Sequence, residues 1–583
     1  MIGNALGKTE KGCNIISTRA KRWLAVLLSA LFTLIPFLMD KVSFMEDDDY
    51  LLSFIANGSY GSDMNSWLVF TKAFFGYLLK PFYFLNDRMN WYAAAMGVIL
   101  FLSMTGIFFC LLEGKRSFWC FLITAGIFAT VEPFFFTFTM VAFMGSAAGI
   151  LLIYTGLINS VRLSYVIPGI LLAFLSWGIR SSAFLPTVLL SLPLFIRPFL
   201  NLVSGLVKNK EQKHDLRRGF FKGLTAICLT AVLFGGANAL EKAEYAPPEW
   251  TQFMNYMNAR STVVDFPAAD YAAHSEEFAE AGLSGTDYAM AVSWRFVEKD
   301  VFTEEALTKA GEIQSRAAGL PQRIAYTKNV FKDRTNQMIL LLPTLIFLFL
   351  LFAEGGARWK TRALLLFFFY GINGALCVIP MRYVPRVAVA LAFADVFFLL
   401  IPSGQKEEGK KNKRSKETAV LTTAAALVFF LLAAGDGALY LKNFWQGASF
   451  RRHKEHYQER EAVRELVRNS KDTLYVFDSL TLAENYYYGL PALKAGRTED
   501  LSNVVRSGSW DSFSPRYYRQ VSHFDVDPDN LFSSMVDNDH VVFVTHWPDT
   551  LNAFLQERTG REIEVKAENL TDDTYICSYT QKE

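Results

Sequence analysis

The chain reads WLAVLLSALFTLIPFLM from Trp23 to Met39 and EDDDY from Glu46 to Tyr50. The first stretch is long and apolar enough to predict a membrane-spanning helix. The second stretch places four carboxylates side by side just beyond that span. Carboxylates repel one another and are costly to desolvate near lipid. We therefore expect this acidic run, residues 46–49, to face water, bind a cation or act as an acid or base at a membrane surface.

The composition of the whole chain is typical of a polytopic membrane protein. Of its 583 residues, 52% are hydrophobic and 15% aromatic, and the apolar residues fall in long blocks separated by short charged stretches. The formal net charge of +2 gives no indication of a nucleic-acid partner. The six cysteines show no CxxC or Cys/His ligand spacing, which argues against a disulfide framework or a zinc site.

The hydropathy pattern predicts about eleven spans, with the basic residues 1–22 in the cytoplasm. The expected spans are Trp23–Met39, one that begins at Trp91, Phe118–Thr130, Phe138–Leu157, Tyr165–Ile179, Phe184–Val203, Phe220–Leu240, Gln337–Phe352, Ala363–Ile379, Val387–Ile401 and Ala419–Tyr440. This number of spans leaves the basic linker Lys406–Lys416 on the cytoplasmic side. The aromatic stretch Trp67–Leu85 is expected to form one or two amphipathic helices in the outer interface.

The fold class that follows is mainly α: a polytopic membrane helical bundle with a small C-terminal extracellular α/β domain. The membrane domain covers residues 23–440 and includes outer loops at residues 40–90 and 241–336. The extracellular domain covers residues 443–583. Two β-type apolar runs mark it, Leu474–Phe477 and Val541–Thr545, flanked by helical patterns over Glu455–Arg468 and Asp549–Gly560. Within the second outer loop, helices are expected near Tyr288–Val297 and Thr303–Ala318.

The acidic run is the strongest candidate for chemistry. A carboxylate at a membrane surface can deprotonate a hydroxyl nucleophile or bind a divalent cation through its oxygens. The alternative is a solvated loop that orients the first span. Asp and Glu contribute little to orientation, however, and four carboxylates followed directly by Tyr-Leu-Leu are an odd spacer.

Several short motifs carry a family resemblance. They are Asp48-Asp49-Tyr50, Gly58-Ser59-Tyr60-Gly61, the stretch Phe70–Tyr83 with its Leu-Leu-Lys-Pro, and Asn90-Trp91-Tyr92. Together they resemble the first outer loop of the C-type polytopic membrane glycosyltransferases (GT-C), in a branch of uncharacterised Gram-positive cell-surface proteins. The resemblance covers the layout of residues 20–440. It implies an acidic catalytic pair beyond the first span, a donor sugar carried on polyprenyl phosphate or pyrophosphate, and inversion at the anomeric carbon.

The resemblance, together with the chemistry of an inverting displacement, assigns candidate roles to the acidic run. Asp48 or Asp49 is the candidate general base. Asp47 or Glu46 assists it, or the four residues Glu46, Asp47, Asp48 and Asp49 bind a divalent cation, Mg²⁺ or Mn²⁺.

Three outer arginines are candidates for binding the donor phosphate: Arg180, Arg382 and Arg386. A guanidinium donates paired hydrogen bonds to phosphate, although each of the three could instead be an interfacial anchor. We expect Tyr50, Asn258 and Arg260 to contact the acceptor or the surrounding loops.

The expected function is transfer of a sugar from the polyprenyl-phosphate donor to a cell-surface glycan or polymer, at the plasma membrane of a bacterium. In the C-terminal domain, Trp510, Tyr517, Tyr518 and Tyr486–Tyr488 are candidates to stack on sugar rings, with core packing as the alternative. Two other function classes remain open. One is a transporter or flippase for lipid-linked glycans, which would be expected to show internal symmetry and charges within its spans. The other is a membrane-anchored scaffold or sensor.

Overall fold

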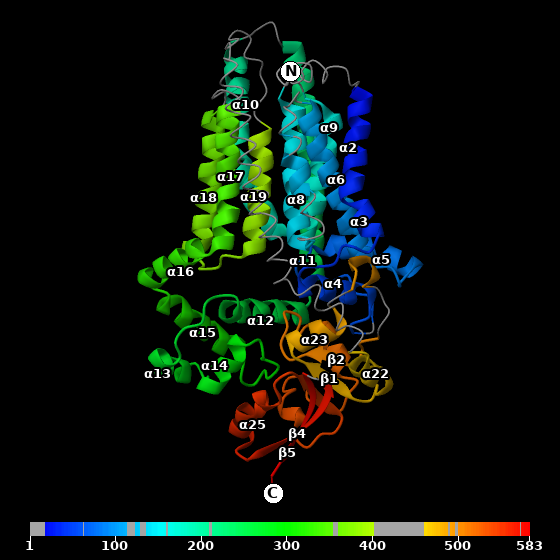
Figure 1. The fold of residues 1–583 in the computed structure, drawn as a ribbon, viewed down its shortest axis with the longest axis vertical. Helices are drawn as coiled ribbons and strands as arrows, with labels where there is room; N and C mark the ends of the chain where they lie inside the picture. The colour runs from blue at the N-terminus through cyan, green and yellow to red at the C-terminus, as the bar shows by residue number, and fades with distance from the viewer. Residues whose placement is uncertain are drawn as a thin grey trace, which may run out of the picture.

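The computed structural model describes residues 18–61, 63–113, 120, 123–128, 136–158, 161–208, 213–353, 359–401, 460–487, 490–495, 500–571 and 573–582. It shows a long helical bundle at one end and a small sheet at the other, with short helices between them (Figure 1). The expected span Ala419–Tyr440, the linker Lys406–Lys416 and most of Phe118–Thr130 lie outside the described residues.

Six helical stretches of the described chain are long and apolar enough to cross a membrane. They are Ala20–Leu38 (α2, Thr18–Phe32, and α3, Leu34–Leu38), Trp91–Leu112 in α6 (Trp91–Glu113), Phe138–Leu157 (α8), Phe221–Glu244 in α11 (Lys213–Glu244), Arg334–Leu351 in α17 (Arg334–Ala353) and Trp359–Val378 (α18). The chain is therefore mainly helical with candidate membrane-spanning helices. Six is fewer than the eleven spans that the sequence predicts.

The difference arises partly from shorter helices within the bundle. These are α9 (Leu163–Ile179), the apolar part of α10 (Ser181–Ile196, within Ser181–Lys208) and α19 (Pro385–Leu400). At 1.5 Å per residue, α9 and α19 reach about 25 Å, less than the ~30 Å of a hydrocarbon core. Helix α10 as a whole is longer, and only its apolar part is this short. Helix α19 is buried over almost its whole length, so its apolar residues pack against neighbouring helices. Hydropathy does not distinguish such a helix from one that faces lipid.

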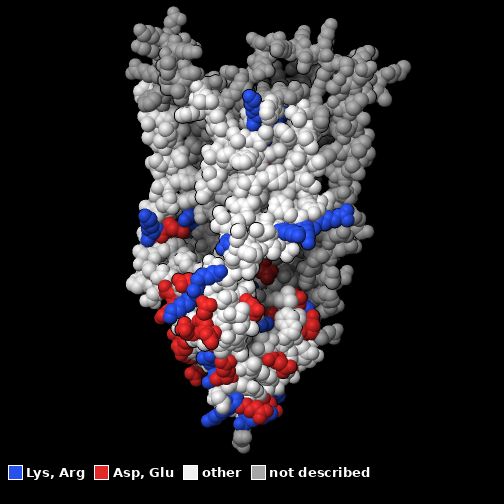
Figure 2. Space-filling model, turned by 90° about the vertical axis from the view of Figure 1, so that its left-hand side faces the viewer, with Lys and Arg blue, Asp and Glu red and all other residues white. Residues whose placement is uncertain are grey.

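The distribution of charge agrees with a membrane-embedded bundle. Figure 2 shows a face on which the described part of the bundle is nearly free of charged side chains, whereas acidic and basic groups crowd the opposite end. Helix α5 (Ala73–Leu85) lies at the base of the bundle, within the stretch predicted to be interfacial. It exposes Phe84 and Leu85 (71% and 80%), as expected of a helix in contact with lipid.

Between α11 and α17 the chain forms a segment of short helices outside the bundle, residues 245–333, which we call the outer helical segment. Its helices are α12 (Pro248–Val264), α13 (Ser275–Glu280), α14 (Gly285–Val292), α15 (Glu304–Ala317) and α16 (Leu320–Lys332). The predicted helix Thr303–Ala318 is confirmed as α15. The other predicted helix is α14. It begins earlier than expected because Ser284 caps its first turn, and it ends at Val292.

The C-terminal region contains a five-stranded sheet in the order β2-β1-β3-β5-β4. The strands are β1 (Leu474–Phe477), β2 (Val504–Arg506), β3 (Val541–Thr545), β4 (Ile563–Thr571) and β5 (Thr574–Gln581), with helices α22 (Glu461–Asn469), α23 (Ser479–Tyr486), α24 (Pro515–Val521) and α25 (Asn552–Thr559). Strand β1 pairs in parallel with both β2 and β3, and β5 pairs antiparallel with β3 and β4. Both predicted strands are confirmed.

The sheet domain is docked against the rest of the molecule. Backbone hydrogen bonds join it to the first outer loop, from the N–H of Ala492 to the carbonyl of Val42 (2.9 Å) and from the N–H of Leu501 to the carbonyl of Ser59 (2.8 Å). A further bond runs from the N–H of Phe296 in the outer helical segment to the carbonyl of Ser507 (3.2 Å). Three parts of the chain that are far apart in sequence therefore meet below the bundle.

Candidate functional site

The acidic run forms the N-terminus of a helix, α4 (Asp47–Asn57), which the sequence analysis did not predict. Three aspartates occupy its first turn, where the helix dipole favours negative charge. The helix ends at Gly58, whose φ of +82° is accessible to glycine at little cost. Because successive residues on a helix are turned by about 100°, the side chains of the run diverge.

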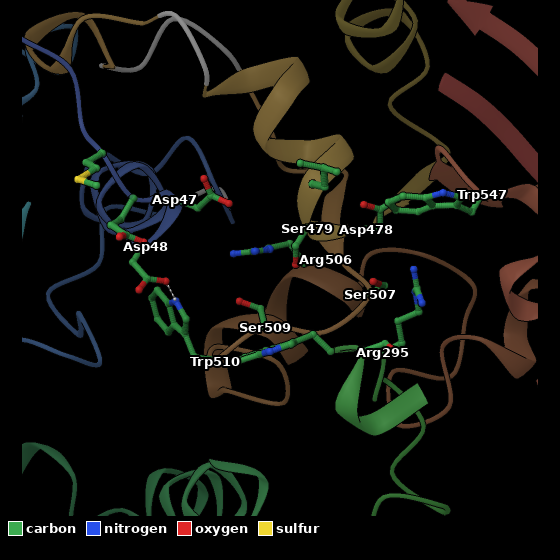
Figure 3. A pocket seen from close by; sticks show the side chains of 15 residues that line it. Asp47, Asp48, Arg295, Asp478, Ser479, Arg506, Ser507, Ser509, Trp510 and Trp547 are labelled. Atoms are coloured by element: carbon green, nitrogen blue, oxygen red, sulfur yellow. Dashed lines mark hydrogen bonds between the residues drawn. The ribbon is translucent and has the colours of Figure 1, made fainter. Parts of the chain in front are cut away.

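Asp48 faces a cavity of about 470 Å³ that lies where the acidic run, the outer helical segment and the sheet domain meet (Figure 3). Its Oδ1 accepts a hydrogen bond from the indole Nε1 of Trp510 (3.1 Å). Glu46 and Asp47 line the same cavity. The structure therefore brings three members of the run to one space next to an aromatic side chain of the C-terminal domain.

Asp49 points the other way, into the interior, and is fully buried. Its Oδ1 accepts hydrogen bonds from the hydroxyl of Tyr92 (3.1 Å) and the backbone N–H of Phe138 (3.0 Å). Burial raises the pKa of Asp49 well above its usual value, and the neighbouring Asp48 adds to this shift. Asp49 thus ties α4 to α6 and α8. Of the two candidate bases, Asp48 lines the cavity and Asp49 does not, and Asp47, expected to assist, also lines it.

Two of the three predicted arginines lie beside the acidic run. Arg386, in the first turn of α19, pairs with Glu46 (Nη1 to Oε1, 2.7 Å). Arg180, at the junction of α9 and α10, lies over the ring of Phe138 (4.3 Å to the centroid) and donates to Ser182 through Nε (3.2 Å). Its Nη1 is buried and has no hydrogen-bond partner in the described structure.

The electrostatics show that these groups form one cluster. Burial and the charges of Arg386 and Arg382 lower the pKa of Arg180 to about 10, against the opposing effect of Asp48 and Asp49. Burial raises the pKa of Glu46, and its ion pair with Arg386 opposes that rise. Arg382 itself pairs with Asp265 of the outer helical segment (3.0 Å). A guanidinium with a free buried N–H, near the positive charges of Arg386 and Arg382, is suited to receive an anion.

The predicted acceptor contacts lie in three different surroundings. Tyr50 is buried, stacks on Tyr487 (5.5 Å between centroids) and donates to the carbonyl of Leu490 (2.8 Å), so it anchors the sheet domain. Asn258 is exposed on α12 and is not part of the cavity lining. Arg260 is buried behind the cavity wall.

Arg260 joins two walls of the cavity from behind. Its Nη1 donates to the carbonyl of Ser509, and its guanidinium lies 5.2 Å from the ring centroid of Trp294. Burial lowers the pKa of Arg260 to about 10. Trp294 lines the cavity and has a φ of +60°, a strained conformation for a non-glycine residue. Arg260 therefore positions this wall.

Most of the cavity wall that the sheet domain and the outer helical segment supply was not predicted from the sequence. It includes Arg295, Asp478, Arg506 and Trp547. Asp478 and Trp547 follow strands β1 and β3, both of which were predicted. Ligands bind preferentially at the carboxyl ends of parallel strands, so this rule could have found these two residues. Arg506 ends β2, a three-residue strand that gave no recognisable signal.

The described aromatic candidates of the sheet domain lie in three different surroundings. Trp510 lines the cavity, whereas Tyr486, Tyr487 and Tyr517 are buried in the core. Tyr518 bonds to Asp529 (2.6 Å) at the junction with the outer helical segment. Tyr488 lies outside the described residues.

A possible metal-ligand group lies elsewhere in the described chain. Ligand atoms of Glu484, His546 and Asp573 all fall within 4.8 Å of one another. Arg460 already pairs with Glu484 and Asp573 (3.0 Å each), which supplies the positive charge there. A divalent cation held by the acidic run stays a prediction.

Comparison of the chain with protein-family models, curated proteins and solved structures finds no match. The function must therefore be argued from the cavity itself. Its lining combines carboxylates, guanidinium groups and three indole rings, those of Trp294, Trp510 and Trp547. Aromatic faces with nearby carboxylates are suited to sugars, because the C–H side of a pyranose packs on a ring while its hydroxyls bond to charged groups.

Proposed function

We propose that this protein is an inverting membrane glycosyltransferase that moves a sugar from a polyprenyl-phosphate-linked donor to a cell-surface acceptor. The observation that carries this proposal is the position of Asp48. Its carboxylate faces the cavity beside Trp510, at the charged end of an apolar bundle, while Arg386 and Arg180 lie on the bundle side of the same acidic run.

The location accounts for a lipid-linked donor. A polyprenyl tail is insoluble in water, so its phosphate must be met at the headgroup plane. Arg180 and Arg386 are supplied by the ends of bundle helices, and Arg180 retains a buried N–H without a partner. These two guanidinium groups would hold the donor phosphate with the sugar directed toward Asp48.

The reaction then needs one proton transfer and one displacement. Asp48 accepts the proton of the acceptor hydroxyl, and the resulting oxygen attacks the anomeric carbon from the face opposite the phosphate. The new C–O bond forms as the bond from that carbon to the phosphate oxygen breaks. The phosphate leaves with the electron pair, and the positive charges of Arg180 and Arg386 stabilise the developing negative charge.

The topology proposed with this function places the N-terminus in the cytoplasm and the sheet domain outside a bacterial plasma membrane. The donor would then be used at the outer leaflet. The charge-poor bundle and the interfacial position of α5 support a membrane location.

The test is transfer by the purified protein in lipid nanodiscs, with a radiolabelled polyprenyl-phosphate sugar and a panel of glycan acceptors. D48N should lower the rate about 10²–10⁴-fold, the usual contribution of a general base. D63N is the matched control, because Asp63 is an exposed acid of the same outer loop outside this cavity. Unchanged transfer by D48N, or passage of the labelled lipid across the bilayer without transfer, would refute the proposal.

A further inference from the structure

The sheet-domain wall of the cavity lies at a topological switch point. Strand β1 has β2 on one side and β3 on the other, all three parallel, so the chain leaves their carboxyl ends in different directions. Such crevices are the usual ligand sites of parallel sheets. Here the residues that follow the three strands, Asp478, Ser507 and Trp547, all line the cavity.

Two guanidinium groups on this wall each have a buried nitrogen without a hydrogen-bond partner. Arg506, the last residue of β2, is only 8% exposed, yet its Nε has no hydrogen-bond partner and the described residues supply no ion pair for it. Figure 3 shows its side chain extending into the cavity toward Asp47 and Asp48. Arg295, from the outer helical segment, is half-buried, and its Nε also lacks a hydrogen-bond partner. Burial lowers the pKa of Arg295, and the nearby charge of Asp478 opposes that shift. Buried guanidinium groups are rarely left unpaired.

One further hydrogen-bond donor is free beside these guanidinium groups. The hydroxyl of Ser509 is buried without a partner and faces the same cavity. Asp478, the carboxylate on this wall, is turned toward its own helix, because Thr481 donates to it from the backbone N–H (3.0 Å) and from the hydroxyl (2.7 Å). Asp478 thereby caps the N-terminus of α23, which begins at Ser479 on the cavity wall.

We propose that Arg506, Arg295 and Ser509 bind an anionic group, phosphate or carboxylate, on the acceptor, and that the protein therefore selects negatively charged glycans or polyol phosphates. This inference rests on the proposed transferase function, because only a transferase would use the bound molecule as an acceptor. The anion would lie on the sheet side of the acidic run, and the donor phosphate would lie on the bundle side. An acceptor held by its charge at Arg506 would present a hydroxyl toward Asp48, across the same cavity.

Direct binding tests this site without any donor. The probes are glycerol phosphate, glucuronate and neutral glucose, titrated by calorimetry into the full-length protein in nanodiscs. Glycerol phosphate or glucuronate should bind at least tenfold more tightly than glucose, and the stronger of the two identifies the anion. R506Q should weaken that binding about tenfold or more, the usual effect of losing a charge-assisted hydrogen bond. R561Q, a change at an exposed arginine of the same domain outside the cavity, should have no effect.

R295Q provides a second variant if R506Q fails to fold, as judged by its melting curve. Equal binding of charged and neutral probes, or equal affinities of R506Q, R295Q and R561Q for the anion, would overturn the inference. If the transferase proposal is wrong and the anion site is right, the result is different. Binding of the anion then depends on Arg506, but no sugar is transferred. Transfer that depends on Asp48 but is equally fast to neutral and anionic acceptors would reject this inference alone.

Discussion

Replacing Gly508 with alanine should disturb the cavity by a steric clash with its wall. Gly508 lies between two residues of the sheet-domain wall, and the outer helical segment passes directly over it. An added Cβ would lie 1.9 Å from the carbonyl oxygen of Trp294 and 3.0 Å from the ring of Phe296. The φ of Gly508 is not in the left-handed region, so the cost comes from this contact alone.

The size of the effect follows from these distances. To restore a separation above 3.0 Å, the backbone at Trp294 or at Gly508 must move by about 1 Å, because the nearest atoms are backbone and cannot rotate away. Overpacking of this kind costs about 1–3 kcal/mol of stability. Since Trp294 lines the cavity and Trp510 follows closely on Gly508, a shift of about 1 Å should also lower transfer about 100-fold.

The assay is thermal unfolding of the protein in nanodiscs, together with the transfer rate below the melting temperature. The matched control is G371A in α18, where an added Cβ meets nothing within 4 Å. G508A should melt earlier and lose transfer, while G371A should keep both. A melting temperature and rate unchanged in G508A would show that the outer helical segment does not pack on the sheet domain as described.

Two further predictions concern contacts that join different segments of the chain near the cavity. Burial raises the pKa of Glu298 to about 7, even though Ser533 donates to it twice (2.6 and 2.9 Å). A raised folded-state pKa gives stability that is complete below the usual pKa of 4.5 and is lost as the pH rises toward 7, at most about 3 kcal/mol. The melting temperature should therefore fall from pH 5 to pH 8, and E298Q should flatten this fall; a parallel pH profile in E298Q would contradict it. Exchanging the charges of the Glu46–Arg386 pair (E46R with R386E) should destabilise the protein less than either substitution alone. A double-mutant cycle on the free energy of unfolding should give a coupling energy of about 1 kcal/mol. Additive effects in that cycle would exclude the contact.

The sequence located the sheet domain but only part of its strands. The runs Leu474–Phe477 and Val541–Thr545 were recognisable because central parallel strands are buried on both faces and read as continuous apolar stretches. Strand β4 is largely exposed and rich in polar residues, so it carries no such signal. Only its pairing with β5 makes it a strand.

The candidate site was predictable to the extent that membrane topology fixes it. The predicted polytopic layout puts the acidic run and the ends of distant helices at the same surface, and the structure brings Arg386 and Arg180 to that run. Helix geometry then separates Asp48 from Asp49, a distinction that required recognising α4. Arg506 and Trp294 depend on contacts between segments far apart in the chain, and a single sequence holds no record of such contacts.

The most direct test of the central claim is a structure of the protein in nanodiscs with a short-chain polyprenyl-phosphate sugar. We predict the phosphate within hydrogen-bonding distance of Arg180 and Arg386, with the anomeric carbon turned toward Asp48. A donor phosphate found away from both arginines, or a sugar on the far side of the acidic run from Asp48, would contradict the account.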